Sequence, residues 1–118
     1  MNQKIEISKT EQLEALTDGL QAFYRVVEKH IGGPIRTDFR QFATVTKTEL
    51  AEYLKSHPLL AEKHVMSEEE ALRLHDHPAL LTENGKWLVC WIDRGTKTNK
   101  AYFDDLPEAA ANFLMAYW

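Results

Sequence analysis

Trp87-Leu88-Val89-Cys90-Trp91-Ile92 is the most informative segment of this chain. It follows Asn84-Gly85, a dipeptide typical of a two-residue hairpin turn, and it is therefore predicted to be a strand. Successive side chains of a strand point to opposite faces, so positions 87, 89 and 91 share one face and positions 88, 90 and 92 share the other. Both faces are apolar. Each therefore needs a cover, which is a helix, a partner protein or a ligand.

The strand over 87–93 is expected to lie at the centre of an antiparallel sheet. The sequence predicts a preceding strand over 79–82, joined by a turn at 83–86, and a following strand over 100–104, after a polar loop at 94–99. Residues 39–45 fit either a short strand or a helical turn, and the strand is the favoured interpretation. The sheet should therefore have about three to four strands, mostly in the C-terminal half.

Four helical segments are predicted around this sheet. A long first helix begins after Ser8 and ends at Gly32-Gly33, with Gly19 in its middle as the mark of a kink or of a close backbone approach. Two short helices follow, one over 46–57 and one over about 68–75, each opened by a capping box. A last helix begins after Asp105. Strands clustered late in the chain with helices around them indicate an α+β fold, in a single domain over residues 1–118.

The composition is that of an ordinary globular protein. Of the 118 residues, 44% are hydrophobic and 27% are charged, which is enough for a core without disulfides. The first six residues lack the apolar run of a signal peptide, and no apolar run approaches the roughly 20 residues that span a bilayer. A single cysteine fits a reducing compartment. We therefore expect a cytoplasmic protein that does not enter a membrane.

Negative charge is concentrated between Thr48 and Asn84. This region has eight carboxylates against three basic side chains, while the whole chain has a net charge of −4. Such a region repels phosphate backbones and attracts basic partners, although a solvated face that keeps the protein soluble is the simpler explanation.

Aromatic side chains form the second candidate feature. Trp87, Trp91 and Tyr102 can share one face of the sheet, where they would either be covered by a helix, for which the first helix is long enough, or contact a partner. Few basic residues lie nearby, so a protein partner is favoured over nucleic acid. The candidate partner-binding residues are therefore Glu68, Glu69, Glu70, Asp76, Trp87, Trp91 and Tyr102.

No pattern in the chain predicts catalysis, a cofactor or a metal. His57, His64, His75 and His77 lie close together in the sequence, but their spacing matches no zinc signature. Cys90 lies in the middle of a predicted strand, where a buried and inert thiol is expected. We therefore predict no catalytic residue, no metal site and no cofactor.

One segment resembles a DNA-binding motif. Residues 46–54, which read Thr-Lys-Thr-Glu-Leu-Ala-Glu-Tyr-Leu, look like the first helix of a helix-turn-helix. With the helix at 68–75 and the hairpin at 79–92, the order of elements resembles a winged-helix domain. Two features argue against DNA binding: ten residues separate the two helices, and the second helix begins with Glu68, Glu69 and Glu70.

In general character the chain resembles bacterial immunity proteins, which are small, acidic proteins that neutralise a toxin by occluding it. The resemblance implies a non-catalytic protein-binding module or inhibitor with a basic partner, and it carries no site residues with it. The alternatives are a winged-helix-like regulator, or a protein-binding derivative of one, and then a small-molecule-binding or enzymatic domain.

Overall fold

A meander of three antiparallel strands forms the sheet in the computed structural model, which describes residues 6–117. The strands β1 (His77–Glu83), β2 (Lys86–Asp93) and β3 (Thr96–Phe103) pair in chain order, so β2 is central, as predicted. Both connections are two-residue turns, Asn84-Gly85 and Arg94-Gly95, and all four of these residues have positive φ. This is the type I′ geometry, which matches the twist of the paired strands.

The third strand contains a bulge that decides which side chains share a face. The Arg94-Gly95 turn leads directly into β3, so the predicted loop over 94–99 is wrong from residue 96 onward. The ladder pairs Trp91 with Thr98 but Val89 with Ala101, which leaves one extra residue in β3 near Asn99. Such a bulge moves every later side chain of β3 to the opposite face from the one it would have in an unbroken ladder.

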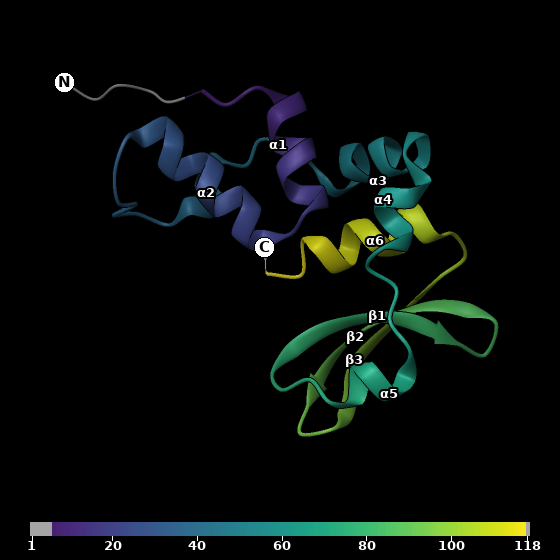
Figure 1. Ribbon diagram of the computed structural model, residues 1–118. Helices are drawn as coiled ribbons and strands as arrows, with labels where there is room; N and C mark the ends of the chain where they lie inside the picture. Colours follow the sequence, from purple (N-terminus) through teal and green to yellow (C-terminus); the bar gives the residue numbers. More distant parts are fainter. Residues whose placement is uncertain (1–5, 118) are drawn as a thin grey trace.

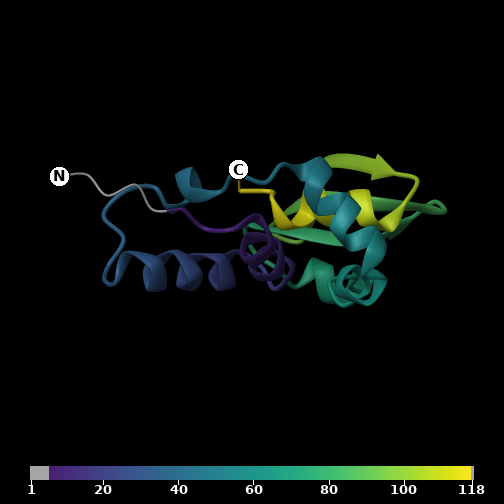
Figure 2. The same ribbon diagram turned by 90° about the horizontal axis from the view of Figure 1, so that it is seen from above.

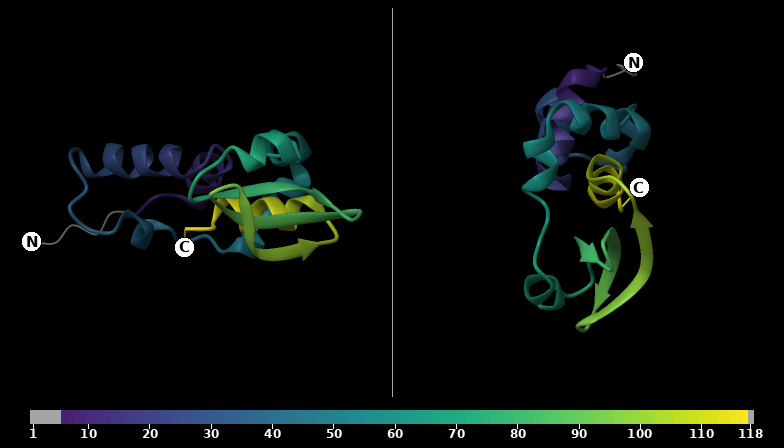
Figure 3. Two further views of the ribbon diagram at one scale, coloured as in Figure 1. Left: turned by 90° about the horizontal axis from the view of Figure 1, so that it is seen from below. Right: turned by 90° about the vertical axis from the view of Figure 1, so that its right-hand side faces the viewer.

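Both apolar faces of β2 are covered by the protein itself. Val89 belongs to the large core that the helices form, together with Leu80 of β1. On the other face, Leu88, Cys90 and Ile92 pack with Ala71 of the five-residue helix α5 (Glu68–Leu72). α5 lies apart from the other helices, at the far side of the sheet (Figure 3).

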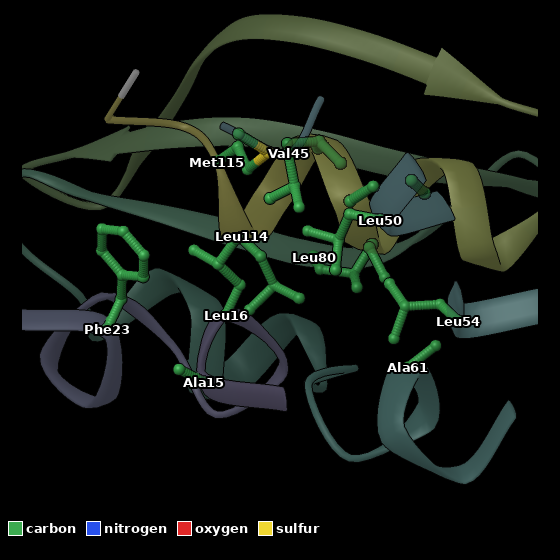
Figure 4. Packing of buried hydrophobic residues seen from close by; sticks show 14 of the residues in the cluster. Ala15, Leu16, Phe23, Val45, Leu50, Leu54, Ala61, Leu80, Leu114 and Met115 are labelled. Carbon is green, nitrogen blue, oxygen red and sulfur yellow. The ribbon is translucent and has the colours of Figure 1, made fainter. Parts of the chain in front are cut away.

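The large core lies between the sheet and a layer of helices. This layer contains α1 (Lys9–Thr17), α3 (Lys47–Ser56), α4 (Pro58–Glu62) and α6 (Leu106–Leu114). Leu16, Leu50, Leu54 and Leu80 are fully buried where the layer meets the sheet (Figure 4). The last helix, α6, covers the Val89 face, which the first helix had been expected to cover. α1 packs instead on α3 and on α2 (Leu20–Ile31), the helix directly after α1.

The long first helix of the sequence prediction is two helices. α1 ends at Thr17, and α2 (Leu20–Ile31) leaves at a sharp angle (Figure 1). Gly19 between them has φ 107° and ψ −179°, a backbone conformation that is essentially restricted to glycine. The glycine therefore marks a complete break in the helix rather than a kink.

The segment over 39–45 is not a strand. Phe39–Phe42 forms a single turn of 3₁₀ helix, η1, which begins where the Asp38 carboxylate accepts a hydrogen bond from the Arg40 main-chain N–H. The Phe39 ring packs edge-on against Tyr24 of α2, with 5.2 Å between ring centroids. The apolar residues of this segment therefore cover α2 instead of pairing with the sheet.

Two further boundaries differ from the sequence prediction. α5 ends at Leu72 rather than near residue 75, and β1 begins at His77 rather than at residue 79. The capping boxes at Thr46 and Ser67 are both present as predicted, each with its glutamate three residues later.

The molecule is elongated because α2 and η1 extend beyond the end of the sheet (Figure 2). Its dimensions are 53 × 32 × 19 Å, and its radius of gyration of 15.2 Å exceeds the roughly 13.5 Å of a compact chain of this length. Within residues 6–117, none of the helices has both the length and the apolar character that crossing a membrane requires.

Candidate functional site

A network of charged side chains lies on the α5 side of the sheet, with Glu83 at its centre. The Glu83 carboxylate accepts hydrogen bonds from Lys97 Nζ at 2.9 Å, from Lys100 Nζ at 3.0 Å and from the Tyr102 hydroxyl at 2.8 Å. Lys97 Nζ also donates to Glu68 Oε1 at 2.8 Å. The network therefore joins α5, β1 and β3 across the central strand.

The network holds Glu83, Lys97 and Lys100 in their charged forms. Hydrogen bonds from Lys97, Lys100 and Tyr102 lower the pKa of Glu83 to about 2. The bonds to Glu68 and Glu83 raise the pKa of Lys97, whose side chain is only 13% exposed. The bond to Glu83 also raises the pKa of the Tyr102 hydroxyl, which stays protonated as the donor. The arrangement is therefore a fixed array of charges at neutral pH.

Cys90 is buried on the same face of the central strand as this network. The residue is 3% exposed, and burial raises the pKa of its thiol. A nucleophilic cysteine needs the opposite, a lowered pKa and an accessible sulfur. The expected burial of Cys90 is confirmed, and its low reactivity stays a prediction.

The acidic first turn of α5 is exposed, but its charge is partly compensated. Glu69 pairs with Arg73 at 2.7 Å, Glu68 pairs with Lys97, and Glu70 accepts from the main chain of Ser67 in the capping box. The negative surface is therefore weaker than the sequence alone indicates.

Two exposed hydrophobic side chains lie on the elements that the network joins. Leu72 of α5 is 37% exposed and Tyr102 of β3 is 43% exposed. Only Leu59 of α4, at 75%, is also a large exposed hydrophobic side chain within residues 6–117. We call this surface the α5–β3 face, defined by Glu68, Glu69, Glu70, Leu72, Arg73, Glu83, Lys97, Lys100 and Tyr102.

Trp91 and Asp76 form a separate pair at the opposite end of β2 from Trp87. Trp91 Nε1 donates to Asp76 Oδ1 at 2.8 Å, and the indole meets Tyr117 edge-on with 5.6 Å between ring centroids. Burial, with a contribution from Asp76, raises the pKa of the Tyr117 hydroxyl. The indole N–H and one edge of the Trp91 ring therefore already have partners within the domain.

Trp87 does not share a face with Tyr102, so the predicted set of three aromatics on one face is wrong. Tyr102 pairs with Leu88, while Trp87 pairs with Phe103 and packs half-buried against the helical core. Without the bulge near Asn99, the ladder from the Arg94-Gly95 turn would bring Tyr102 opposite Trp87. The bulge turns Tyr102 to the α5 side, where it meets Glu83.

The histidines have separate structural surroundings. His57 stacks on Tyr53 with 4.3 Å between ring centroids, His64 Nε2 donates to the Thr17 carbonyl at 2.6 Å, and His77 Nδ1 donates to the Pro78 carbonyl at 2.6 Å. Over the described range 6–117, no group of three or more His, Cys, Asp or Glu side chains could hold a metal ion.

A hollow of about 430 Å³ lies where α1 meets α2, and sequence reasoning missed it. Gly19, His64, His77, Phe113 and Tyr117 are among its lining residues. They come from four separate parts of the chain, so only the fold brings them together. The sequence had drawn attention to Gly19, as the mark of a kink, and to His64 and His77, as histidines without a zinc signature, but nothing in it placed the three together.

Comparison with known proteins found no relative of this chain. No protein-family model, no curated protein and no solved structure matches this chain.

Proposed function

We propose that the domain is a non-catalytic protein-binding module and that the α5–β3 face is its contact surface. The observation that carries the proposal is that two of the large exposed hydrophobic side chains, Leu72 of α5 and Tyr102 of β3, belong to the two elements that one charge network joins. Apolar anchors beside ordered charges are what protein interfaces use. Of the candidate residues, Glu68, Glu69, Glu70 and Tyr102 lie on this face.

The charged side chains of the α5–β3 face support a proposal about the charge of the partner. Four carboxylates on the face (Glu68, Glu69, Glu70 and Glu83) are opposed by three cations, Arg73, Lys97 and Lys100. The face keeps a net negative charge, so we propose a basic partner and an inhibitor of the immunity type, acting in the cytoplasm. Because the excess is small, charge should steer association without dominating affinity.

Trp87, Trp91 and Asp76 support the proposal less. Trp87 packs on the helical core, and Trp91 uses its N–H on Asp76, so these three residues already have partners within the domain. We therefore propose no partner contact through Trp87, and only a peripheral one through Trp91 and Asp76.

The winged-helix alternative has little geometric support. A winged helix needs its two helices packed together, whereas α3 packs on α6 and α5 packs on the opposite face of the sheet. α5 has only five residues, and its exposed first turn is acidic. These features do not suit a helix that enters the major groove.

The hollow beside Gly19 favours a second candidate, binding of a small molecule. Its volume of about 430 Å³ falls within the usual size of ligand sites, and aromatic and histidine side chains line it. Chemical-shift changes confined to His64, His77, Phe113 and Tyr117 on addition of a fragment library would favour this candidate.

A charge reversal on the proposed face tests the protein-binding function. Glu69→Lys should slow association with a captured partner about threefold or more, and the difference should shrink at high salt. Glu52→Lys is the matched control, because it makes the same change in net charge on an exposed residue of α3. Equal rates for both variants, or tight binding of wild-type protein to duplex DNA at physiological salt, would reject the proposal.

A further inference from the structure

The break between α1 and α2 depends on one residue that cannot be replaced without moving the backbone. Gly19 has φ 107° and ψ −179°, a region open essentially only to glycine. A Cβ placed on Gly19 would have no atom within 4 Å. An alanine would therefore fit in space but would have to leave this conformation.

The apolar residues on both sides of the break have the spacing of one continuous helix. Leu16, Leu20, Phe23 and Val27 follow one another at steps of four, three and four, so they would share one face if the helix ran through Gly19. The fused helix would cover Lys9–Ile31, which is roughly 34 Å at 1.5 Å per residue. Helical phase is thus kept across a junction where the helix is interrupted.

Two side chains that follow α4, Lys63 and His64, contact the junction. His64 Nε2 donates to the Thr17 carbonyl, which in a continuous helix would accept from the Gln21 main-chain N–H. Lys63 Nζ pairs with Asp18 next to the break. We call these two side chains, Lys63 and His64, the clamp. Their contacts replace part of the main-chain hydrogen bonding that is lost where the helix is interrupted.

We propose that Gly19 is a hinge and that the binding partner at this hinge is a second copy of the chain. When the clamp opens, α1 and α2 fuse into one helix, and α1 leaves its place beside α3. The α1 of a second copy takes that place and repeats the same contacts, so that two chains exchange α1 reciprocally in a two-fold dimer. The exchange leaves both α5–β3 faces uncovered, so the dimer is bivalent.

The contact between α1 and α3 reports which chain supplies α1. Lys9 Nζ lies 2.8 Å from Glu49 Oε2, close enough for a carbodiimide to join the two side chains as an amide. In the closed monomer the cross-link forms within one chain. In the exchanged dimer it forms between chains and gives a covalent dimer on a denaturing gel.

Gly19→Ala should raise the dimer fraction at fixed concentration about tenfold or more, with Lys9–Glu49 cross-links between chains, because alanine favours the continuous helix. Gly32→Ala is the matched control. Gly32 also has positive φ (80°) and open space around its Cβ position, but it ends α2 and joins no second helix. His64→Ala, which removes the clamp's hydrogen bond to the Thr17 carbonyl, should shift the equilibrium in the same direction as Gly19→Ala.

A G19A protein that stays monomeric, or whose Lys9–Glu49 cross-links all lie within one chain, would overturn the proposal. If G19A does not fold, the wild-type chain decides the matter. Wild-type protein refolded at millimolar concentration should give a dimer fraction with inter-chain cross-links, and a purely monomeric product would equally overturn the proposal.

Discussion

Lys97 Nζ and the Glu83 carboxylate lie 2.9 Å apart, although their residues belong to the two edge strands of the sheet. Their contact spans β2 on the side where Leu88 and Cys90 are buried. The pair thus ties both edges of the sheet together and fixes the positions of Glu68, Lys100 and Tyr102 around it.

Stability should depend on the charge of Glu83 at acidic pH. The pKa of Glu83 falls from an ordinary 4.5 to about 2 in the folded protein, so the unfolded chain binds more protons between these values. The stabilisation is therefore complete above about pH 5 and is lost as the pH falls toward 2. Urea unfolding across this range should show a weaker pH dependence for Glu83→Gln than for wild type. Identical slopes would show that the network does not hold this carboxylate.

His64 should contribute a second pH dependence, at higher pH. Burial lowers its pKa below the ordinary 6.5, so protonation is disfavoured in the folded state. Its contribution to stability is present above about pH 6.5 and is lost as the pH falls through the folded-state pKa. Two-dimensional NMR should show the His64 ring titrating below pH 6.5, and a normal or raised titration midpoint would contradict its burial.

The buried side-chain amide of Gln12 should contribute strongly to the stability of the fold. Gln12 is fully buried, donates to the carbonyl of Ile7 and to Thr44 Oγ1, and accepts from the main-chain N–H groups of Thr44 and Val45. Gln12→Leu leaves these partners unsatisfied and should lower the free energy of unfolding by about 2 to 4 kcal/mol. Gln21→Leu, at an exposed position, should change it by less than about 0.5 kcal/mol. Similar effects of the two variants in urea unfolding would show that Gln12 does not join α1 to the segment before α3.

Cys90 should be structural. The thiol is buried on the apolar face of β2, so native protein should react with thiol reagents far more slowly than unfolded protein. Cys90→Ser should cost about 1 to 3 kcal/mol, because it buries a hydroxyl group among apolar side chains. Rapid labelling of the native protein would instead make Cys90 a candidate nucleophile.

The parts of the fold that sequence reasoning predicted are those with local signals. Asn84-Gly85 and the apolar run after it identified the central hairpin, and Ser67 with Glu70 identified the start of α5. Both signals act within a few residues. The fold class follows from them because it needs only the order of the elements.

The parts that sequence reasoning missed depend on contacts between distant segments. Because of the bulge near Asn99, Tyr102 faces Glu83 instead of lying beside Trp87. No pattern in the neighbouring sequence predicted this bulge. The break at Gly19 is held by His64, which lies more than forty residues later. Phe39 does not pair in a strand, because its ring packs edge-on against Tyr24 of α2.

Capture of a partner by matched surface variants tests the proposed function most directly. Tagged wild-type protein and two variants are incubated with native lysate, and each bound protein is quantified by mass spectrometry. Leu72→Ser combined with Tyr102→Ala removes both apolar anchors of the α5–β3 face, while Leu59→Ser removes the exposed side chain of α4. We expect a partner that wild type and L59S retain equally and of which the double variant retains about tenfold less. A partner retained by the double variant, or lost with L59S, would contradict the claim that the α5–β3 face is the binding surface.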